Sequence, residues 1–285
     1  MSVSVFEIYG NRYYYQFDDL MNLHYGASAT TKANKLLPEA DFVKMKQNEM
    51  GVKEFKAWFA KKADFGTVFH ILVKTYIEQK ELLHSDIIDL MKSYYVDPAE
   101  AGRMIKGLLS VITFIKDYDI EFTFTEKTFL DLNSKTGGTI DAYGFSRKLE
   151  QNLLIDWKSG NYTTMPLNYD LQLSIYKNIL TREGFEVDRA LLVCPKDWRT
   201  KPSYNVLECV EVLDYETEMQ RYDRLFRDAD VKLFFGDKYS VPANGSLTID
   251  TIDNLTTYKT TLAKELLIKH QSASELYGNG KSDII

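Results

Sequence analysis

Two strand-like runs joined by a polar connection, between Gly138 and Lys158, constrain the fold of this chain more than any other stretch. The first run, residues 139–143, follows paired glycines and combines β-branched with aromatic side chains, which favours a strand. The second run, residues 153–155, is apolar and short enough to be a buried strand. Because the polar residues 146–152 connect the two runs, the stretch predicts a β-hairpin.

Each predicted strand carries an acidic residue. Asp141 lies in the first strand, and Asp156 follows the second, two positions before Lys158. Because side chains alternate faces along a strand, Asp156 and Lys158 should point the same way, and strand pairing can bring Asp141 beside them. Two carboxylates and a lysine suit a hard divalent cation and a phosphate. Taken singly, each acid could equally well be a solvent-exposed residue at a turn or strand end.

The segments around the hairpin predict a mixed sheet. Residues 121–126 alternate as a strand does, and residues 129–132 prolong it before a turn at 134–138, so a three-stranded antiparallel meander is expected. A helix at 169–180 and a buried strand at 190–194 follow, and a strand, helix and strand in this order bring in parallel pairing. We therefore expect an α/β protein that leans towards α+β, with a mixed central β-sheet flanked by helices.

The first part of the chain is rich in aromatic residues and is expected to be irregular, apart from a small hairpin around residues 9–12. Stacking of Tyr13 to Tyr15 on nucleic-acid bases is one interpretation, but aromatic residues on a strand are more often core. Further elements are predicted along the chain: helices at 40–60, 66–81 and 98–116, and a strand at 204–212.

The length of 285 residues suggests about two domains, although single domains of this size occur. We expect one compact domain with three segments: an N-terminal aromatic-rich extension at 1–60, a core at 61–215 and a C-terminal helical extension at 216–285. The C-terminal extension contains two predicted helices, at 215–234 and 255–270.

Composition excludes several classes of protein. No apolar run approaches the roughly 20 residues that a membrane helix needs, and the N-terminus has no signal-peptide pattern, so a cytoplasmic protein without membrane association is expected, in a host cytoplasm if the source is viral. The net charge of −6 argues against a general nucleic-acid coat protein, but not against local binding of nucleic acid.

Two cysteines, Cys194 and Cys209, are too few for a four-cysteine cluster, so no iron–sulfur cluster is expected. No G-x-x-x-x-G-K-[ST] motif is present, so the chain is not expected to use ATP.

Four short motifs follow one another along the chain: G-x-x-x-H, G-x-x-D, D-x-K and Q-x-x-x-Y. Their residues are Gly66, His70, Gly138, Asp141, Asp156, Lys158, Gln172 and Tyr176. This series resembles that of the RecB-type branch of PD-(D/E)XK nucleases, over roughly residues 60–215. D-x-K alone occurs by chance in many proteins, but four motifs in order, each on the expected element, are a strong signal. The N-terminal part resembles phage-type and mitochondrial exonucleases of the branch more loosely.

The resemblance implies a restriction-endonuclease-like core with helical N- and C-terminal additions, metal-dependent phosphodiester hydrolysis and a DNA substrate. It implies four ligands for Mg²⁺ or Mn²⁺: His70, Asp141, Asp156 and the main-chain carbonyl of Trp157. An imidazole ligand suits Mn²⁺ better than Mg²⁺. Asp141, Asp156 and Lys158 are the implied catalytic residues, with Lys158 orienting water or stabilising charge on the phosphoryl oxygens.

Other residues have supporting roles by the same resemblance. Gln172 and Tyr176, four positions apart on one helical face, support the site and help to place the DNA strand, together with Gly66 and Gly138. Glu126, in the first strand, is a weaker candidate that could assist the cluster or face solvent. By itself, His70 on an apolar helix face would more often be a packed core residue.

The predicted function is a DNA nuclease that serves recombination, repair or phage DNA metabolism, and an exonuclease on single strands or duplex ends is the favoured type. A separate helicase or recombination protein could act as its partner. The alternative is a noncatalytic DNA- or protein-binding protein that retains the nuclease fold. A smaller possibility is a nuclease directed at RNA.

Overall fold

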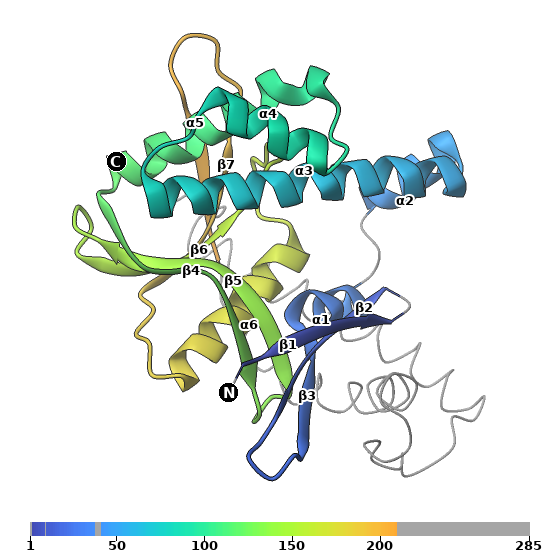
Figure 1. The fold of residues 1–285 in the computed structure, drawn as a ribbon, viewed down its shortest axis with the longest axis vertical. Coiled ribbons are helices and arrows are strands. Elements are labelled where there is room, and N and C mark those ends of the chain that lie inside the picture. Colours follow the sequence, from blue (N-terminus) through green and yellow to red (C-terminus); the bar gives the residue numbers. More distant parts are fainter. Residues whose placement is uncertain (1, 9, 38–40, 210–285) are drawn as a thin grey trace.

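The computed structural model describes residues 2–8, 10–37 and 41–209, which form an eight-stranded mixed open sheet with helices packed on both faces (Figure 1). The strands are β1 (Ser4–Ile8), β2 (Asn11–Phe17), β3 (Leu23–Ser28), β4 (Ile120–Asp131), β5 (Thr136–Ser146), β6 (Gln151–Trp157), β7 (Arg189–Pro195) and β8 (Tyr204–Glu208). The helices are α1 (Ala29–Leu36), α2 (Asp41–Met50), α3 (Val52–Gln79), α4 (His84–Ser93), α5 (Ala101–Asp117), which a short 3₁₀ turn precedes, and α6 (Leu167–Arg182). This architecture confirms the predicted mixed α/β class.

The predicted meander and parallel crossover are both present. β4, β5 and β6 pair antiparallel in sequence order, and β6 pairs parallel with β7 through the crossover helix α6. β8 then pairs antiparallel with β7. The sheet order is β1-β2-β3-β5-β6-β7-β8, with β4 along the other edge of β5.

One edge of β5 is shared by two strands. β4 pairs with the whole length of β5, so β3 and β6 both lie along the opposite edge. The pairs with β3 end at Gly137, and those with β6 begin at Ala142. Residues 138–141 of β5 therefore lie in a gap between two ladders, where side chains can approach the strand.

Apolar side chains form a separate core on each face of the sheet. Helices α3, α4 and α5 cover one face, where Phe69, Met104 and Trp157 are among the fully buried residues. Helix α6 covers the other face with α1 packed beside it, and Leu173 and Leu180 are buried there. Each buried leucine contributes roughly 2 kcal/mol, so the helices that carry the motifs are firmly held on the sheet.

The predicted hairpin around residues 9–12 is confirmed by the pairing of β1 with β2, but the expectation that the surrounding residues are irregular is wrong. Residues 4–28 form three antiparallel strands, and β3 continues the sheet by parallel pairing with β5. Tyr13 and Tyr14 are buried, which favours the structural interpretation of the tyrosine cluster over base stacking. The strands form here because aromatic side chains from this hairpin can pack against the rest of the sheet, a gain that local sequence does not reveal.

The sequence also predicts the break between two helices in the wrong place, between residues 60 and 66. The chain breaks at Gly51, whose φ of +83° is accessible to glycine at little cost. α3 then runs without interruption from Val52 to Gln79, so Gly66 lies inside a helix and does not begin one. The assigned boundary between residues 60 and 61 falls within this helix.

Some predictions lie outside the described residues, namely the helices at 215–234 and 255–270, the end of the strand predicted at 204–212, and the C-terminal extension as a whole. Among the residues that the structure describes, no helix is long and apolar enough to cross a membrane.

A buried polar cluster anchors the turn between β4 and β5. The carboxylate of Asp131, 4% exposed, accepts hydrogen bonds from Ser134 N (3.2 Å), Ser134 Oγ (2.5 Å) and Arg182 Nη1 (2.5 Å). Lys32 Nζ donates to Ser134 O (3.0 Å) and Thr136 Oγ1 (2.7 Å). The cluster ties α1, α6 and the start of β5 together.

Replacement of Asp131 by Asn should lower the free energy of unfolding by roughly 2 kcal/mol at pH 7, because buried donors lose a charged acceptor. Burial opposes ionisation of this carboxyl group, but the hydrogen bonds from Ser134 and Arg182 hold its pKa below the usual value. The difference in the free energy of unfolding between wild type and Asp131→Asn should therefore have its full size above the pKa of Asp131 in the unfolded chain, about 3.9. It should disappear as the pH falls through the lower pKa of the folded protein. Urea unfolding between pH 2.5 and 7 measures it.

Asp89→Asn, at an exposed aspartate of α4 that forms a surface ion pair with Lys92, is the matched control and should be neutral. A pH-independent difference for Asp131→Asn would contradict the assigned role of the charge.

Candidate metal centre

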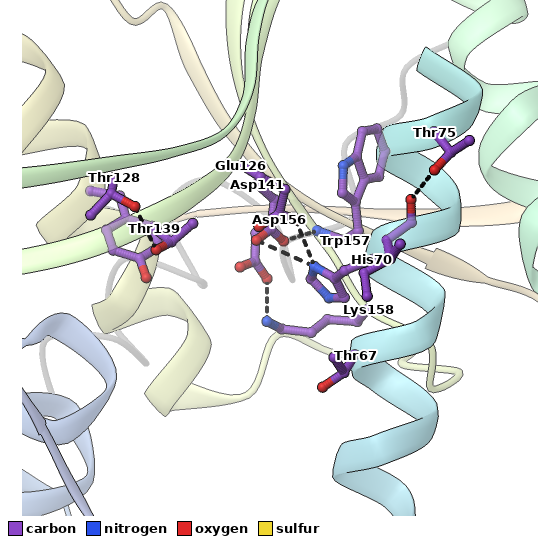
Figure 2. A network of polar contacts seen from close by, with 12 residues as sticks. Thr67, His70, Thr75, Glu126, Thr128, Thr139, Asp141, Asp156, Trp157 and Lys158 are labelled. Carbon is purple, nitrogen blue, oxygen red and sulfur yellow. Dashed lines mark hydrogen bonds and ion pairs between the residues drawn. The ribbon is translucent and has the colours of Figure 1, made fainter. Parts of the chain in front are cut away.

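A cluster of ionisable side chains around His70, in the middle of α3, forms the candidate metal centre. The Nδ1 atom of His70 lies 3.3 Å from Glu126 Oε1 on β4 and 3.4 Å from Asp141 Oδ1 on β5 (Figure 2). Burial alone would lower the pKa of His70, but the negative charge of Asp141 and hydrogen bonds to both carboxylates raise it to about 10. Without a bound cation, His70 is therefore protonated at neutral pH, and a metal ion would have to displace that proton.

Glu126 adopts an unusual backbone conformation within β4. Its φ is +47°, whereas strand residues have a negative φ. The flanking pairs Thr125–Ala142 and Lys127–Ile140 place it opposite Asp141. A non-glycine residue in this region costs about 1 kcal/mol or more and is maintained only where the surroundings enforce it. Here the conformation coincides with a carboxylate that contacts His70, so the weaker sequence candidate belongs to the centre.

Asp141 is held by the main chain of the neighbouring strand. Trp157 N donates a hydrogen bond to Asp141 Oδ2 at 2.8 Å, just beyond the last ladder pair between β5 and β6. The other oxygen, Oδ1, faces His70. Burial opposes ionisation of Asp141, but the charges of His70 and Lys158 keep its pKa below the usual value. Trp157 thus contributes its N–H group, and its carbonyl as a metal ligand stays a prediction.

Asp156 and Lys158 point the same way from β6, as their spacing predicts. Lys158 Nζ lies 2.6 Å from Asp156 Oδ2 and 4.5 Å from the centre of the Tyr169 ring. Burial and the charge of Asp141 raise the pKa of Asp156 to about 6, although Lys158 opposes this. Burial would lower the pKa of Lys158, but the charges of Asp156 and Asp141 raise it above its usual value. The lysine is consequently charged at neutral pH.

Gln172 and Tyr176 approach the same place from α6. Gln172 Nε2 donates to Asp156 Oδ1 (3.4 Å) and to Tyr176 Oη (3.2 Å). A Cβ atom on Gly138 would lie 2.3 Å from the Tyr176 ring, so only glycine allows the ring to pack against β5 at this point. These three residues of the sequence motifs therefore meet in the gap beside β5.

Gly66 differs from its predicted role. A Cβ atom here would meet only Ser159 Oγ, at 3.9 Å, so no other backbone approaches closely. Gly66 lies one turn before His70 on α3, and its lack of a side chain leaves space next to the loop that follows Lys158.

The ligand atoms of His70, Glu126 and Asp141 converge within 4.8 Å of one another. One imidazole and two carboxylate oxygens at this spacing fit a divalent cation such as Mn²⁺ or Mg²⁺. Three carboxylates, those of Glu126, Asp141 and Asp156, meet two cationic groups, His70 and Lys158, so the centre has a net negative charge when all five groups are ionised. The side-chain ligands predicted from the sequence are His70, Asp141 and Asp156, so the predicted set contains Asp156 where this group contains Glu126. In the structure, Asp156 faces Lys158.

Comparison of the chain with protein-family models and with curated proteins gives no match. The functional argument therefore depends on the residues of the centre.

Glu126→Gln should weaken Mn²⁺ binding by at least about tenfold, because loss of a ligand should cost no less than loss of a residue that only orients one. Calorimetric titration of the purified chain with MnCl₂ measures the dissociation constant. Glu121→Gln, on the same strand but 68% exposed and paired with Arg147, is the matched control and should bind Mn²⁺ as wild type does. Wild-type affinity in Glu126→Gln would remove Glu126 from the ligand set.

Proposed function

We propose that this protein is a metal-dependent deoxyribonuclease that hydrolyses phosphodiester bonds, chiefly as an exonuclease. One observation carries the proposal: motif residues from four separate elements, α3, β5, β6 and α6, meet at the gap beside β5. They follow the chain order of the RecB-type motif series. A chance D-x-K sequence would not be accompanied by a histidine, a second acid and a glutamine–tyrosine pair around the same point.

The acidic residues and His70 would hold the cation, with Glu126 added to the ligands that the resemblance implies. When bound, a divalent cation stabilises negative charge on the phosphoryl oxygens and acidifies the attacking water. Without it, the chain presents closely spaced buried carboxylates, which would repel a phosphate diester. The metal is therefore an essential part of the proposal, in the form of Mg²⁺ or Mn²⁺.

Lys158 supplies fixed positive charge at the reacting phosphate. The charges of Asp156 and Asp141 hold the pKa of Lys158 above its usual value, which favours the charged form over a general base. The ion pair with Asp156 and the Tyr169 ring hold the ammonium group in place. The favoured role is electrostatic stabilisation of the charge that develops on the phosphoryl oxygens.

Gln172 and Tyr176 act through Asp156. The amide of Gln172 donates to both Asp156 Oδ1 and Tyr176 Oη, which fixes the orientation of the carboxylate. This arrangement supports a positioning role for the pair, as the resemblance implies. A role in DNA recombination, repair or phage DNA metabolism, a cytoplasmic location and a separate helicase partner accompany the proposal.

Lys158→Ala and Asp156→Asn should each lower the rate of Mn²⁺-dependent DNA cleavage at least about 100-fold, because each removes a charge from the site of phosphate activation. Asp156→Asn is preferred to Asp156→Ala because an amide of the same shape fills the space next to Lys158. A time course with end-labelled single-stranded DNA, duplex DNA and single-stranded RNA measures activity, strandedness and polarity together. Circular dichroism and thermal unfolding check the fold.

Lys148→Ala, at an exposed lysine of the β5–β6 turn, is the matched control and should cleave as wild type does. Unchanged cleavage in Lys158→Ala would sink the proposed mechanism. Binding of DNA by a folded wild-type chain that cleaves none of these substrates with Mn²⁺ or Mg²⁺ would favour the noncatalytic alternative, and cleavage of RNA alone would reassign the substrate.

A further inference from the structure

The first half of α3 extends beyond the sheet together with α2 (Figure 1). α2 folds back on α3 at Gly51, and the two helices share an aromatic cluster in which the Trp58 ring lies 6.3 Å from Phe42 and 5.9 Å from Phe55. Phe55 is buried, whereas Phe42 and Phe59 are 52% and 55% exposed. The protruding helices therefore have their own packed centre and still present large aromatic side chains to solvent.

One side of α3 leads from this exposed end to the metal centre. With 3.6 residues per turn, Lys56, Phe59, Ala63 and Thr67 recur on the side that carries His70. Figure 2 shows Thr67 and His70 on the same side of the helix, next to Lys158. Phe59 precedes His70 by eleven residues, a rise of about 16 Å along the axis. Ala63 has a small side chain and Gly66 has none, so neither residue obstructs this side of the helix between Phe59 and His70.

The charge at this end of α3 favours an anionic partner. Residues 52–67 contain four lysines and two acids, although the chain as a whole has a net charge of −6. Lys56 is exposed and lies one turn before Phe59, and Lys62 lies beside the row with its ammonium 5.9 Å from the Trp58 ring centre. An exposed aromatic ring with flanking lysines matches the way in which proteins bind the bases and backbone of single strands.

We propose that Lys56, Phe59, Ala63, Gly66 and Thr67 form a binding track, the α3 track, for a single-stranded polynucleotide that enters the metal centre at His70. The proposal rests on the proposed nuclease function and specifies its substrate as single-stranded. Phe59 stacks on an unpaired base, and Lys56 contacts a phosphate. A duplex does not fit this role, because its bases are already stacked on one another and present no free face to Phe59.

The α3 track can be tested by binding alone, with EDTA present so that no strand is cleaved. Fluorescence anisotropy compares a labelled single-stranded DNA, the duplex of the same sequence and a single-stranded RNA on the full chain. Phe59→Ala should weaken binding of the single strand about tenfold, the loss expected for one base–aromatic stack. Lys56→Ala should weaken it and lower the slope of log K against log salt by about 0.7, one phosphate contact. The RNA arm distinguishes the two kinds of polynucleotide.

Two matched controls separate the track from general surface effects. Lys61→Ala removes an exposed lysine of the same helix that lies about 140° around the axis from Lys56. Phe145→Ala removes a phenylalanine that is 38% exposed on β5. Both variants should bind single-stranded DNA as wild type does.

Unchanged affinity in Phe59→Ala and Lys56→Ala, equal losses in the controls, or tighter binding of the duplex than of the single strand would overturn the track. So would a photo-crosslink, in the absence of nucleic acid, from benzoylphenylalanine at position 59 to residues 210–285 or to a second copy of the chain. If the variants lose binding but wild type never cleaves with Mn²⁺, the track stands and the nuclease proposal fails. If wild type cleaves and the variants bind normally, only the track fails.

Discussion

The gap along one edge of β5 is the constraint on which the candidate centre depends. Two strands, β3 and β6, pair with that edge and leave residues 138–141 between their ladders. The main-chain N–H of Trp157, which would continue the ladder, donates instead to the Asp141 carboxylate. A buried N–H needs a partner, so this bond fixes one carboxylate oxygen and leaves the other facing His70. Backbone pairing thus sets the orientation of an ionisable side chain.

Charge balance explains the remaining arrangement. Glu126, Asp141 and Asp156 gather around two cationic groups, His70 and Lys158. Burial makes each charge costly, and the opposing pKa changes of Asp141 and Asp156 show that the negative charges are not compensated equally. The left-handed backbone of Glu126 adds a further carboxylate at a conformational cost. Excess negative charge and local strain both cost stability, and the proposed cation would offset the charge.

Helix α3 connects this centre to the exterior of the protein. Beyond the sheet, the helix loses the apolar surface that would otherwise bury it, and packing against α2 across the Gly51 break replaces that surface. The result is a single continuous helix with a residue of the candidate metal centre in its middle and exposed aromatic and basic residues at one end. The packing of α2 against α3 therefore also supports the exposed surface along which the substrate is proposed to bind.

The sequence by itself determined the meander, the crossover helix and the direction in which Asp156 and Lys158 point, because strand alternation and helical spacing are local properties. The resemblance of the motif series also marked His70, Gln172 and Tyr176. The sequence did not determine that residues 4–28 join the sheet or that Gly51 divides the early helices, and it left Glu126 undecided. The first depends on the pairing of β3 with β5, the break at Gly51 on the packing of α2 against α3, and the role of Glu126 on a backbone conformation within the assembled sheet. Contacts between residues far apart in the chain decided them, since the free energy of such contacts exists only once the strands have been brought together.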